Sequence, residues 1–220
     1  LGLEQVRWLP DSSGVVVFAS DSRSQRPGAM YGLDLKTGQY KRLVAIPQGR
    51  SAIVAVAPDG KSLYLSENGA GIERILGVDL ASGTEREVAR LTNGGQSASG
   101  LSISPDGDSL VVQTWADQPK RLGRLLIVKT DGTGTRELVP SFSADRTLGI
   151  VRWTADGRYI FYFTTADNGD WRLMRISPAG GPPEFAGLDS TKLTGTVRIP
   201  PPWPFSPLSM DVSPDGARVV

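Results

Sequence analysis

A short turn motif recurs along the chain and constrains its fold more than any other feature. Each copy has an alternating apolar run, then Pro-Asp-Gly or a close variant, then a second run rich in apolar residues. The five copies are centred on Asp11, Asp59, Asp106, Asp156 and Asp215. These aspartates are 48, 47, 50 and 59 residues apart, so one repeat unit is about 48 residues long. A regular period of this length indicates a repeat protein.

Each of the four complete units also carries a second turn, whose glycine follows the glycine of the first turn by 23 to 25 residues. These residues favour tight turns, because proline presets the backbone, aspartate bonds the following amides and glycine accepts a left-handed conformation. Two such turns divide a unit into two hairpins. Four antiparallel strands in 40 to 50 residues are typical of a β-propeller blade. The sequence therefore predicts an all-β propeller built from four-stranded antiparallel blades.

The spacing of the motif sets the expected boundaries of the blades. Four blades are predicted at approximately 1–48, 49–96, 97–145 and 146–196. A Pro-rich insert follows at 197–207, and residues 208–220 supply the first two strands of a fifth blade. We therefore expect about 4.5 blades, arranged as a partial ring. The first copy of the motif departs from the others, because Ser12-Ser13 is expected to lengthen its turn.

Two positions on the innermost strand of each blade differ in character. The residue two places before the proline position is large and apolar in every copy: Trp8, Val56, Ile103, Trp153 and Val212. We expect this residue to pack between blades. Its preceding neighbour varies and is expected to point the other way, as a surface position: Arg7, Ala55, Ser102, Arg152 and Asp211.

The composition excludes several classes of function. The chain has no histidine and no cysteine, which removes His-dependent triads, thiolate chemistry, disulfides and the usual zinc sites, and we expect no cofactor. A net charge of +1 gives no general attraction to nucleic acid. The longest apolar runs are about five residues, such as 15–19, so no segment is expected to insert into a membrane.

The motif resembles the repeat of the TolB-like family of WD-repeat-like β-propellers, in which an apolar-Ser-Pro-Asp-Gly turn precedes an apolar strand. The clearest copies run from Ile103 to Val112 and from Val212 to Val220. The resemblance implies a parent ring of six to eight blades. It also implies membership of a larger protein: an envelope assembly protein, a sensor region of a membrane kinase or transcription regulator, or the gating propeller of a prolyl oligopeptidase-like or dipeptidyl peptidase-like enzyme. A periplasmic or extracellular location is the resulting expectation.

The repeated turn residues are interpreted as structural. Equivalent aspartates, one in each blade, cannot approach one another as the paired carboxylates of a glycosidase do. The same interpretation applies to the glycines that follow four of them, Gly60, Gly107, Gly157 and Gly216.

A cluster of oxygen-bearing side chains, Asp167, Asn168 and Asp170, lies between two predicted strands. Calcium prefers such ligands, but Asn168-Gly169 is also a favoured two-residue hairpin turn. We favour the turn and expect no metal, and calcium remains the alternative.

Two groups of residues are candidates for binding. Arg7 and Arg152 are expected near the central channel, opposite Asp211, where they suit a small anionic ligand or a partner's carboxylate, with inter-blade salt bridges as the alternative. The second group comprises aromatic residues of loops: Trp203 and Phe205 of the insert, together with Trp115 and Trp171. They suit an interface with a protein or peptide, although they could equally pack onto the blades.

We therefore expect a non-enzymatic propeller scaffold for protein or ligand binding or sensing, within a larger bacterial-type envelope or sensor protein, with no catalytic residues in this chain. The alternative is the non-catalytic gating propeller of a serine peptidase. A Gly-x-Ser-x-Gly segment beyond Val220 would identify that alternative. A third class, a propeller hydrolase or lyase, would need acids converging on the channel, for which Asp211 is the candidate.

Overall fold

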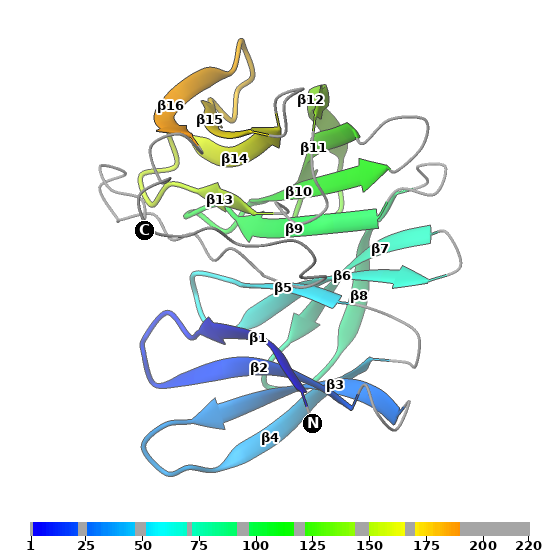
Figure 1. The fold of residues 1–220 in the computed structure, drawn as a ribbon. Coiled ribbons are helices and arrows are strands. Elements are labelled where there is room, and N and C mark those ends of the chain that lie inside the picture. The colour runs from blue at the N-terminus through cyan, green and yellow to red at the C-terminus, as the bar shows by residue number, and fades with distance from the viewer. Residues whose placement is uncertain are drawn as a thin grey trace. The chain divides into compact units, whose positions relative to one another are not determined.

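The structure, a computed structural model, describes eight stretches of the chain. These are 2–21, 26–46, 52–69, 72–91, 97–116, 122–143, 150–165 and 170–189. They contain sixteen β-strands in four separate sheets of four strands each. This confirms the predicted all-β architecture of four-stranded antiparallel blades (Figure 1). The predicted insert at 197–207 and the fifth blade at 208–220 lie outside the described residues.

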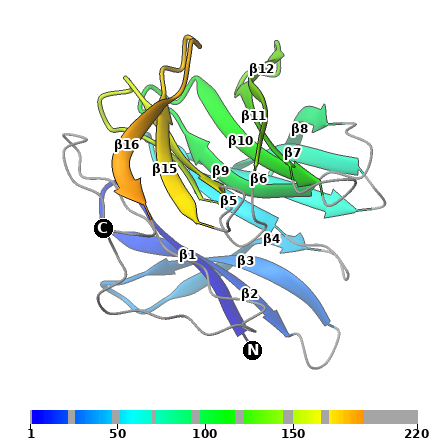
Figure 2. The same cartoon turned by 45° about the horizontal axis from the view of Figure 1, so that its top comes forward.

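The chain divides into two compact units, and the first contains two blades. The first blade consists of β1 (Gly2–Trp8), β2 (Gly14–Asp21), β3 (Arg26–Asp34) and β4 (Tyr40–Ile46). The second blade consists of β5 (Ala52–Val56), β6 (Ser62–Gly69), β7 (Ile72–Asp79) and β8 (Glu85–Leu91). In both blades the strands pair antiparallel in chain order (Figure 2).

The second unit contains the third and fourth blades, with the same strand order. The third blade consists of β9 (Ser97–Ile103), β10 (Ser109–Ala116), β11 (Leu122–Lys129) and β12 (Thr135–Ser143). The fourth consists of β13 (Val151–Trp153), β14 (Ile160–Thr165), β15 (Trp171–Ile176) and β16 (Glu184–Asp189). The tip of the β11–β12 hairpin, residues 129–134, belongs to the first unit.

The Pro-Asp-Gly segments form the turn between the first and second strands of a blade. In the second blade the Ala57 amide donates to the Ser62 carbonyl, and the Gly60 amide donates to the Ala57 carbonyl. Gly60 has a φ of 67°, a left-handed conformation in which a side chain is strained. Gly107 and Gly157 take the same role in the third and fourth blades, with φ values of 81° and 70°.

The turn of the first blade corrects the expectation that Ser12-Ser13 lengthens it. The Leu9 amide donates to the Gly14 carbonyl and the Ser12 amide to the Leu9 carbonyl, which is the spacing of the second blade. Ser12 therefore occupies the place of Gly60, with a φ of 60°. Gly14 is needed for another reason, because a Cβ there would lie 2.4 Å from the Leu33 carbonyl oxygen. A glycine required by close packing was mistaken for the glycine of the turn.

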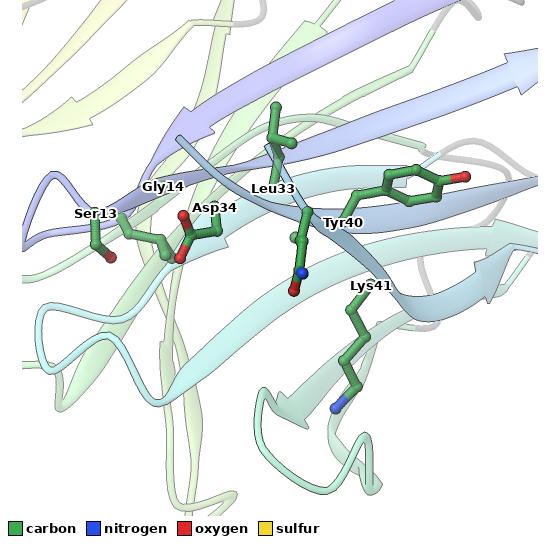
Figure 3. Close-up of a pocket in the computed structure, with 9 residues that line it drawn as sticks. Ser13, Gly14, Leu33, Asp34, Tyr40 and Lys41 are labelled. Atoms are coloured by element: carbon green, nitrogen blue, oxygen red, sulfur yellow. The ribbon is translucent and has the colours of Figure 1, made fainter. Parts of the chain in front are cut away.

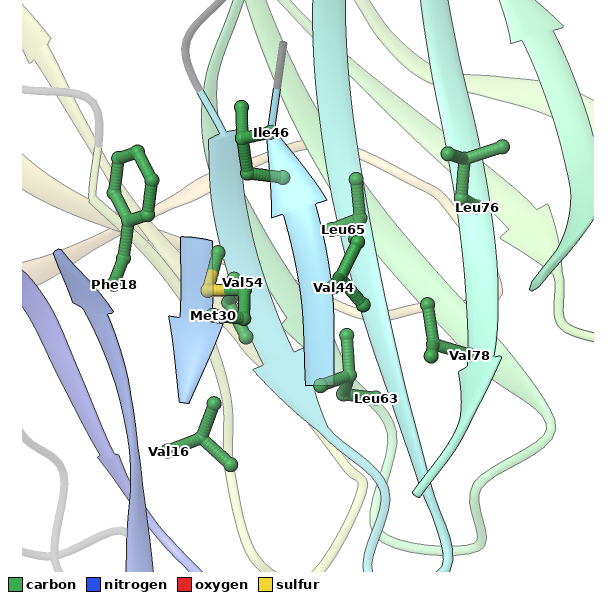
Figure 4. Close-up of a cluster of buried hydrophobic side chains, with 10 residues drawn as sticks. All are labelled: Val16, Phe18, Met30, Val44, Ile46, Val54, Leu63, Leu65, Leu76 and Val78. Atoms are coloured by element: carbon green, nitrogen blue, oxygen red, sulfur yellow. The ribbon is translucent and has the colours of Figure 1, made fainter. Parts of the chain in front are cut away.

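The first two blades pack face to face. Val16, Phe18, Met30, Val44 and Ile46 of the first blade form one cluster with apolar residues of the second blade, and Figure 4 shows these side chains between the ribbons. The residues contributed by the second blade are Val54, Leu63, Leu65, Leu76 and Val78. The third and fourth blades share an equivalent cluster that includes Val111 and Ile127 on one side and Ile160 and Tyr162 on the other.

The apolar position of the innermost strand has different surroundings in different blades. Val56 packs against the cluster of the first unit, and Trp153 packs against that of the second. The expectation of burial is wrong for Trp8, which is 63% exposed. Its face points away from the second blade, because Trp8 pairs with Val15 whereas its neighbour Arg7 pairs with Val16 of the core cluster.

The strained Ser12 gives a prediction about stability. We expect Ser12→Gly to raise the free energy of unfolding by about 0.5 to 1 kcal/mol, because glycine removes the left-handed strain and costs part of that gain in chain entropy. Urea unfolding followed by circular dichroism measures the change. Ser13→Gly is the control, and it should destabilise because the Ser13 hydroxyl donates to Asp11. Equal losses in the two variants would contradict the assignment of Ser12 to the glycine position.

Candidate functional site

The aspartates of the first turns bond to their own turns. The Asp11 carboxylate accepts from the Ser13 amide and hydroxyl, and this amide lowers the pKa of Asp11 below its usual range. Asp106 accepts from the Asp108 amide and the Ser104 hydroxyl. Asp59 and Asp156 accept in the same way from the amides two residues later. These carboxylates fix the backbone of the turns, as capping acceptors do.

The second turn of three blades is capped similarly. The amide of Thr37 lowers the pKa of Asp34, and the amide of Ser82 lowers that of Asp79. In the third blade the hydroxyl of Thr133 does the same for Asp131. A carboxylate held by donors from its own turn is stabilised as the anion, so it is a poor proton donor or base for a substrate.

A hollow of about 310 Å³ lies beside the turns of the first blade (Figure 3). Its charged lining residues are Asp34 and Lys41, but Asp34 caps its own turn and the Lys41 ammonium donates to the Ala81 carbonyl. Figure 3 shows the Lys41 side chain extending away from the Asp34 carboxylate. Among the described residues that line the hollow, the two charges do not converge on a common point.

The arginines expected at the central channel contact backbone. The Arg7 guanidinium donates from Nε to the Val54 carbonyl of the second blade at 3.3 Å and from Nη1 to the Val6 carbonyl at 2.9 Å. Arg152 donates to the Val151 carbonyl at 2.9 Å. In the second unit Ser102, which is equivalent to Arg7, accepts from the Trp153 amide of the next blade at 3.2 Å. The variable position is therefore not simply a surface position, because at Arg7 and Ser102 it joins adjacent blades.

The two described candidate tryptophans lie at corresponding ends of their blades. Trp115 is near the end of β10, and Trp171 begins β15, where the second strand of a blade passes to the third. Both are half-buried. The Trp171 ring meets the Phe163 ring edge to face, with 5.1 Å between centroids. Trp171 thus has a packing role, and the adjacent Arg172 is exposed.

The remaining candidates are only partly described. Asp211, Trp203, Phe205, Asp167 and Asn168 lie outside the described residues, as do Asp215 and Gly216 of the last turn. Asp170 is half-buried just before β15. Within the eight described stretches, no three acidic side chains are grouped as metal ligands. The same stretches contain no helix with the length and apolar character needed to cross a bilayer.

Two buried acids in the second blade were not anticipated from the sequence. Glu67 is 4% exposed and pairs with Arg74, and Glu73 is 2% exposed and accepts from the Ser66 hydroxyl. Both lie near the ends of β6 and β7. Nothing in the alternation of this hairpin distinguishes buried carboxylates from the solvated charges of an exposed strand.

A repeated inter-blade contact was also missed. A basic residue near the start of the fourth strand of one blade donates to a carbonyl in the second turn of the next blade. We call this second turn, between the third and fourth strands, the outer turn, and we call the contact the cation latch. The Lys41 ammonium reaches the Ala81 carbonyl at 3.0 Å, and Arg86 Nη2 reaches that of Thr130 at 2.5 Å. Arg136 donates to the Pro178 carbonyl in the same way. The sequence signal is a Lys or Arg three or four residues after the outer-turn glycine in three consecutive repeats.

Comparison with known proteins supports the fold. No protein-family model matches the sequence, and no curated protein is significantly similar to it. Among solved structures, TolB from Acinetobacter baumannii matches with a TM-score of 0.65 and 18% identity, over 84% of this chain and 43% of that chain. A chain of the nidogen/laminin complex matches with a TM-score of 0.64 and 13% identity, over 83% and 64%.

An enzyme matches as well. The acylaminoacyl peptidase of Pyrococcus horikoshii has a TM-score of 0.58 and 14% identity, over 85% of this chain and 32% of that chain. This chain spans less than two thirds of each of the three matched chains. At these identities the likeness establishes the fold, and the chain has the β-propeller blades of TolB and related propellers.

The cation latch predicts a difference between two arginines of β8. We expect Arg86→Met to lower the free energy of unfolding by about 1 kcal/mol, because it removes a charged donor from a carbonyl and keeps most of the alkyl stem. The control is Arg90→Met, whose exposed ion pair with Glu87 should contribute much less to stability, because solvent and salt screen it. Urea unfolding of both variants measures the losses, and an equal or larger loss for Arg90→Met would contradict the role of the latch.

Proposed function

We propose that this chain is a non-catalytic β-propeller segment that binds a protein or peptide partner, within a larger bacterial-type envelope or sensor protein. The observation that carries this proposal is the use of its polar residues. The turn aspartates hold their own turns, and the cations at Arg7, Lys41 and Arg86 hold backbone carbonyls of neighbouring blades. Residues committed in this way support a rigid scaffold rather than a reaction.

The two ends of the blades differ in what they offer to a partner. One end carries the turns between the first and second strands, whose aspartates accept hydrogen bonds from amides of the same turn. The opposite end, in the second unit, carries half-buried Trp115 and Trp171 with exposed Arg172. Tryptophan and arginine are enriched among residues that dominate the energy of protein interfaces. We therefore place the binding surface at the end with the tryptophans.

The likeness to an acylaminoacyl peptidase supports the second candidate, the gating propeller of a serine peptidase. In that role the chain would still carry no catalytic residue. The two candidates differ in what the rest of the polypeptide contains. A Gly-x-Ser-x-Gly segment followed by an acid and a histidine would identify a hydrolase domain and favour the peptidase.

A displayed-peptide selection tests the binding role. Peptides are selected on the purified chain, and the affinity of the best one is measured by fluorescence anisotropy. We expect Trp115→Ala and Arg172→Ala each to weaken binding about tenfold or more, as loss of an interface anchor does. Asp108→Ala is the control, because Asp108 is exposed on the β9–β10 turn, at the end of the third blade opposite Trp115, and its replacement should leave the affinity unchanged.

Two outcomes would contradict the proposal. A selected peptide whose affinity falls with Asp108→Ala but not with Trp115→Ala would place binding at the opposite end of the third blade. Cleavage of the peptide by the purified chain would show that the segment itself is catalytic.

A further inference from the structure

The hollow in the first blade lies over a floor of backbone (Figure 3). Its lining includes Gly14 and Gly32, which belong to the neighbouring strands β2 and β3 and share the face of Val16. Because glycine has no side chain, the backbone of both strands stays uncovered beside the hollow. Leu9, which packs against the cluster shared by the first two blades, supplies an apolar wall. The hollow is thus an apolar recess at the margin of a packed interface.

The second blade shows what occupies the equivalent place there. Gly77 of β7 corresponds to Gly32, because each lies six residues before the glycine of its outer turn. Tyr64 of β6 pairs with Gly77, and its ring lies over the glycine, with Cε1 3.2 Å from the position that a Cβ would take. Tyr64 is 7% exposed, and Gly77 is buried. In this blade a phenol ring therefore covers the glycine.

The first blade has no such ring at the corresponding position. Val16 pairs with Gly32 as Tyr64 pairs with Gly77, and the valine side chain is much shorter. The three heavy atoms nearest to a Cβ at Gly32 all belong to Leu43, at 3.5 Å or more. Gly32 is accordingly half-buried. The hollow corresponds to the place that the phenol ring fills in the second blade.

The first unit pairs an aromatic ring with a strand glycine at a second place. The Phe18 ring lies over Gly28, with Cε2 2.7 Å from the position of a Cβ, so that only glycine fits beneath it. Glycine inside a strand often marks a point where another group approaches the backbone closely. At Gly28 and Gly77 that group is an aromatic side chain of the same blade. At Gly32 the approach is open to a ligand.

A polar group at the hollow suits the hydroxyl of a phenol. Asp34 lines the hollow, and the Lys36 and Thr37 amides both donate to its Oδ1. A carboxylate has about four acceptor sites, so Asp34 can cap its turn and still accept from a ligand. Hydrogen bonds from a neutral donor to an ionised acceptor are stronger than those between neutral groups. A phenol offers both a flat ring and such a donor.

We propose that the hollow is a binding site for a single phenol ring, either of a small phenol or of a tyrosine side chain in a partner. The ring lies on the backbone of Gly14 and Gly32, and its hydroxyl donates to the Asp34 carboxylate. The site belongs to the first blade, so it goes beyond the proposed binding role and does not depend on the tryptophans of the second unit.

Saturation-transfer NMR of the 220-residue chain with p-cresol, which is the side chain of tyrosine, tests the proposal. We expect transfer to the ring protons and a dissociation constant of about 1 mM, in the range of a ligand this small. Gly32→Leu fills the hollow and should weaken binding about tenfold or more. Gly134→Leu is the matched control, because a Cβ there meets nothing within 4 Å and the residue does not line the hollow. It should leave the affinity unchanged.

Gly32→Ala separates loss of the site from loss of the fold. Its Cβ would meet Leu43 at 3.5 Å, an ordinary contact, so the variant should keep the native circular dichroism spectrum. It should weaken p-cresol binding, although less than Gly32→Leu does. N-acetyltyrosine amide distinguishes the two sources of the ring. Binding of both ligands assigns the hollow to a tyrosine side chain, and binding of p-cresol alone assigns it to a free phenol.

Three results would overturn the proposal. The first is the absence of saturation transfer to p-cresol. The second is equal binding of p-cresol by the unchanged chain and by folded Gly32→Ala and Gly32→Leu, which would place the ligand elsewhere. The third concerns 4-methylanisole, which has the ring without a hydroxyl donor and should bind about tenfold more weakly. If it binds as tightly as p-cresol, the hydroxyl does not donate to Asp34.

Discussion

The structure depends on the packing of one four-stranded sheet against the face of another. A single blade exposes side chains on both faces to water, and it gains stability only when neighbours remove those faces from solvent. Met30, Val44, Leu63 and Leu65 show the result in the first unit, where side chains from two blades form one buried cluster. Turn geometry, inner-strand contacts and outer latches all align the sheets so that these faces meet.

Polar residues assist the packing at two places, the first strand and the fourth strand of a blade. At the innermost strand Arg7 bonds the Val54 carbonyl, and the Ser102 hydroxyl accepts from the Trp153 amide. Near the outermost strand Lys41 and Arg86 bond carbonyls of the next outer turn. Neither set competes with the apolar cluster, since both use donors and acceptors at its margins. Several charged residues that would be candidates for a functional site by sequence alone, such as Arg7, Lys41 and Arg86, thus stabilise the contact between blades.

The period of the turn motif was enough to predict the strands, their antiparallel order and the blade, because Pro, Asp and Gly act through local geometry. Errors arose where a local pattern had two explanations. Gly14 was taken for the glycine of a turn, although it avoids a clash with Leu33 and Ser12 accepts the left-handed conformation. Arg7 is a different case, because alternation cannot distinguish a channel from a neighbouring blade, and both a place near the channel and an inter-blade contact were expected alternatives; its bond to the Val54 carbonyl joins two blades. The burial of Trp8 depends on which neighbour is present, which no local pattern encodes. The partial ring and the fifth blade stay predictions.

The function follows less directly, because propeller blades of this kind occur in TolB and in a peptidase alike. The central claim is that a blade is stabilised by what covers its face, and equivalent tryptophans test it most directly. The free energy of unfolding of the 220-residue chain is measured for Trp153→Ala and Trp8→Ala. The account predicts a loss of about 2 to 3 kcal/mol at Trp153, which packs between blades, and less than about 1 kcal/mol at exposed Trp8. Equal losses at the two positions would contradict it.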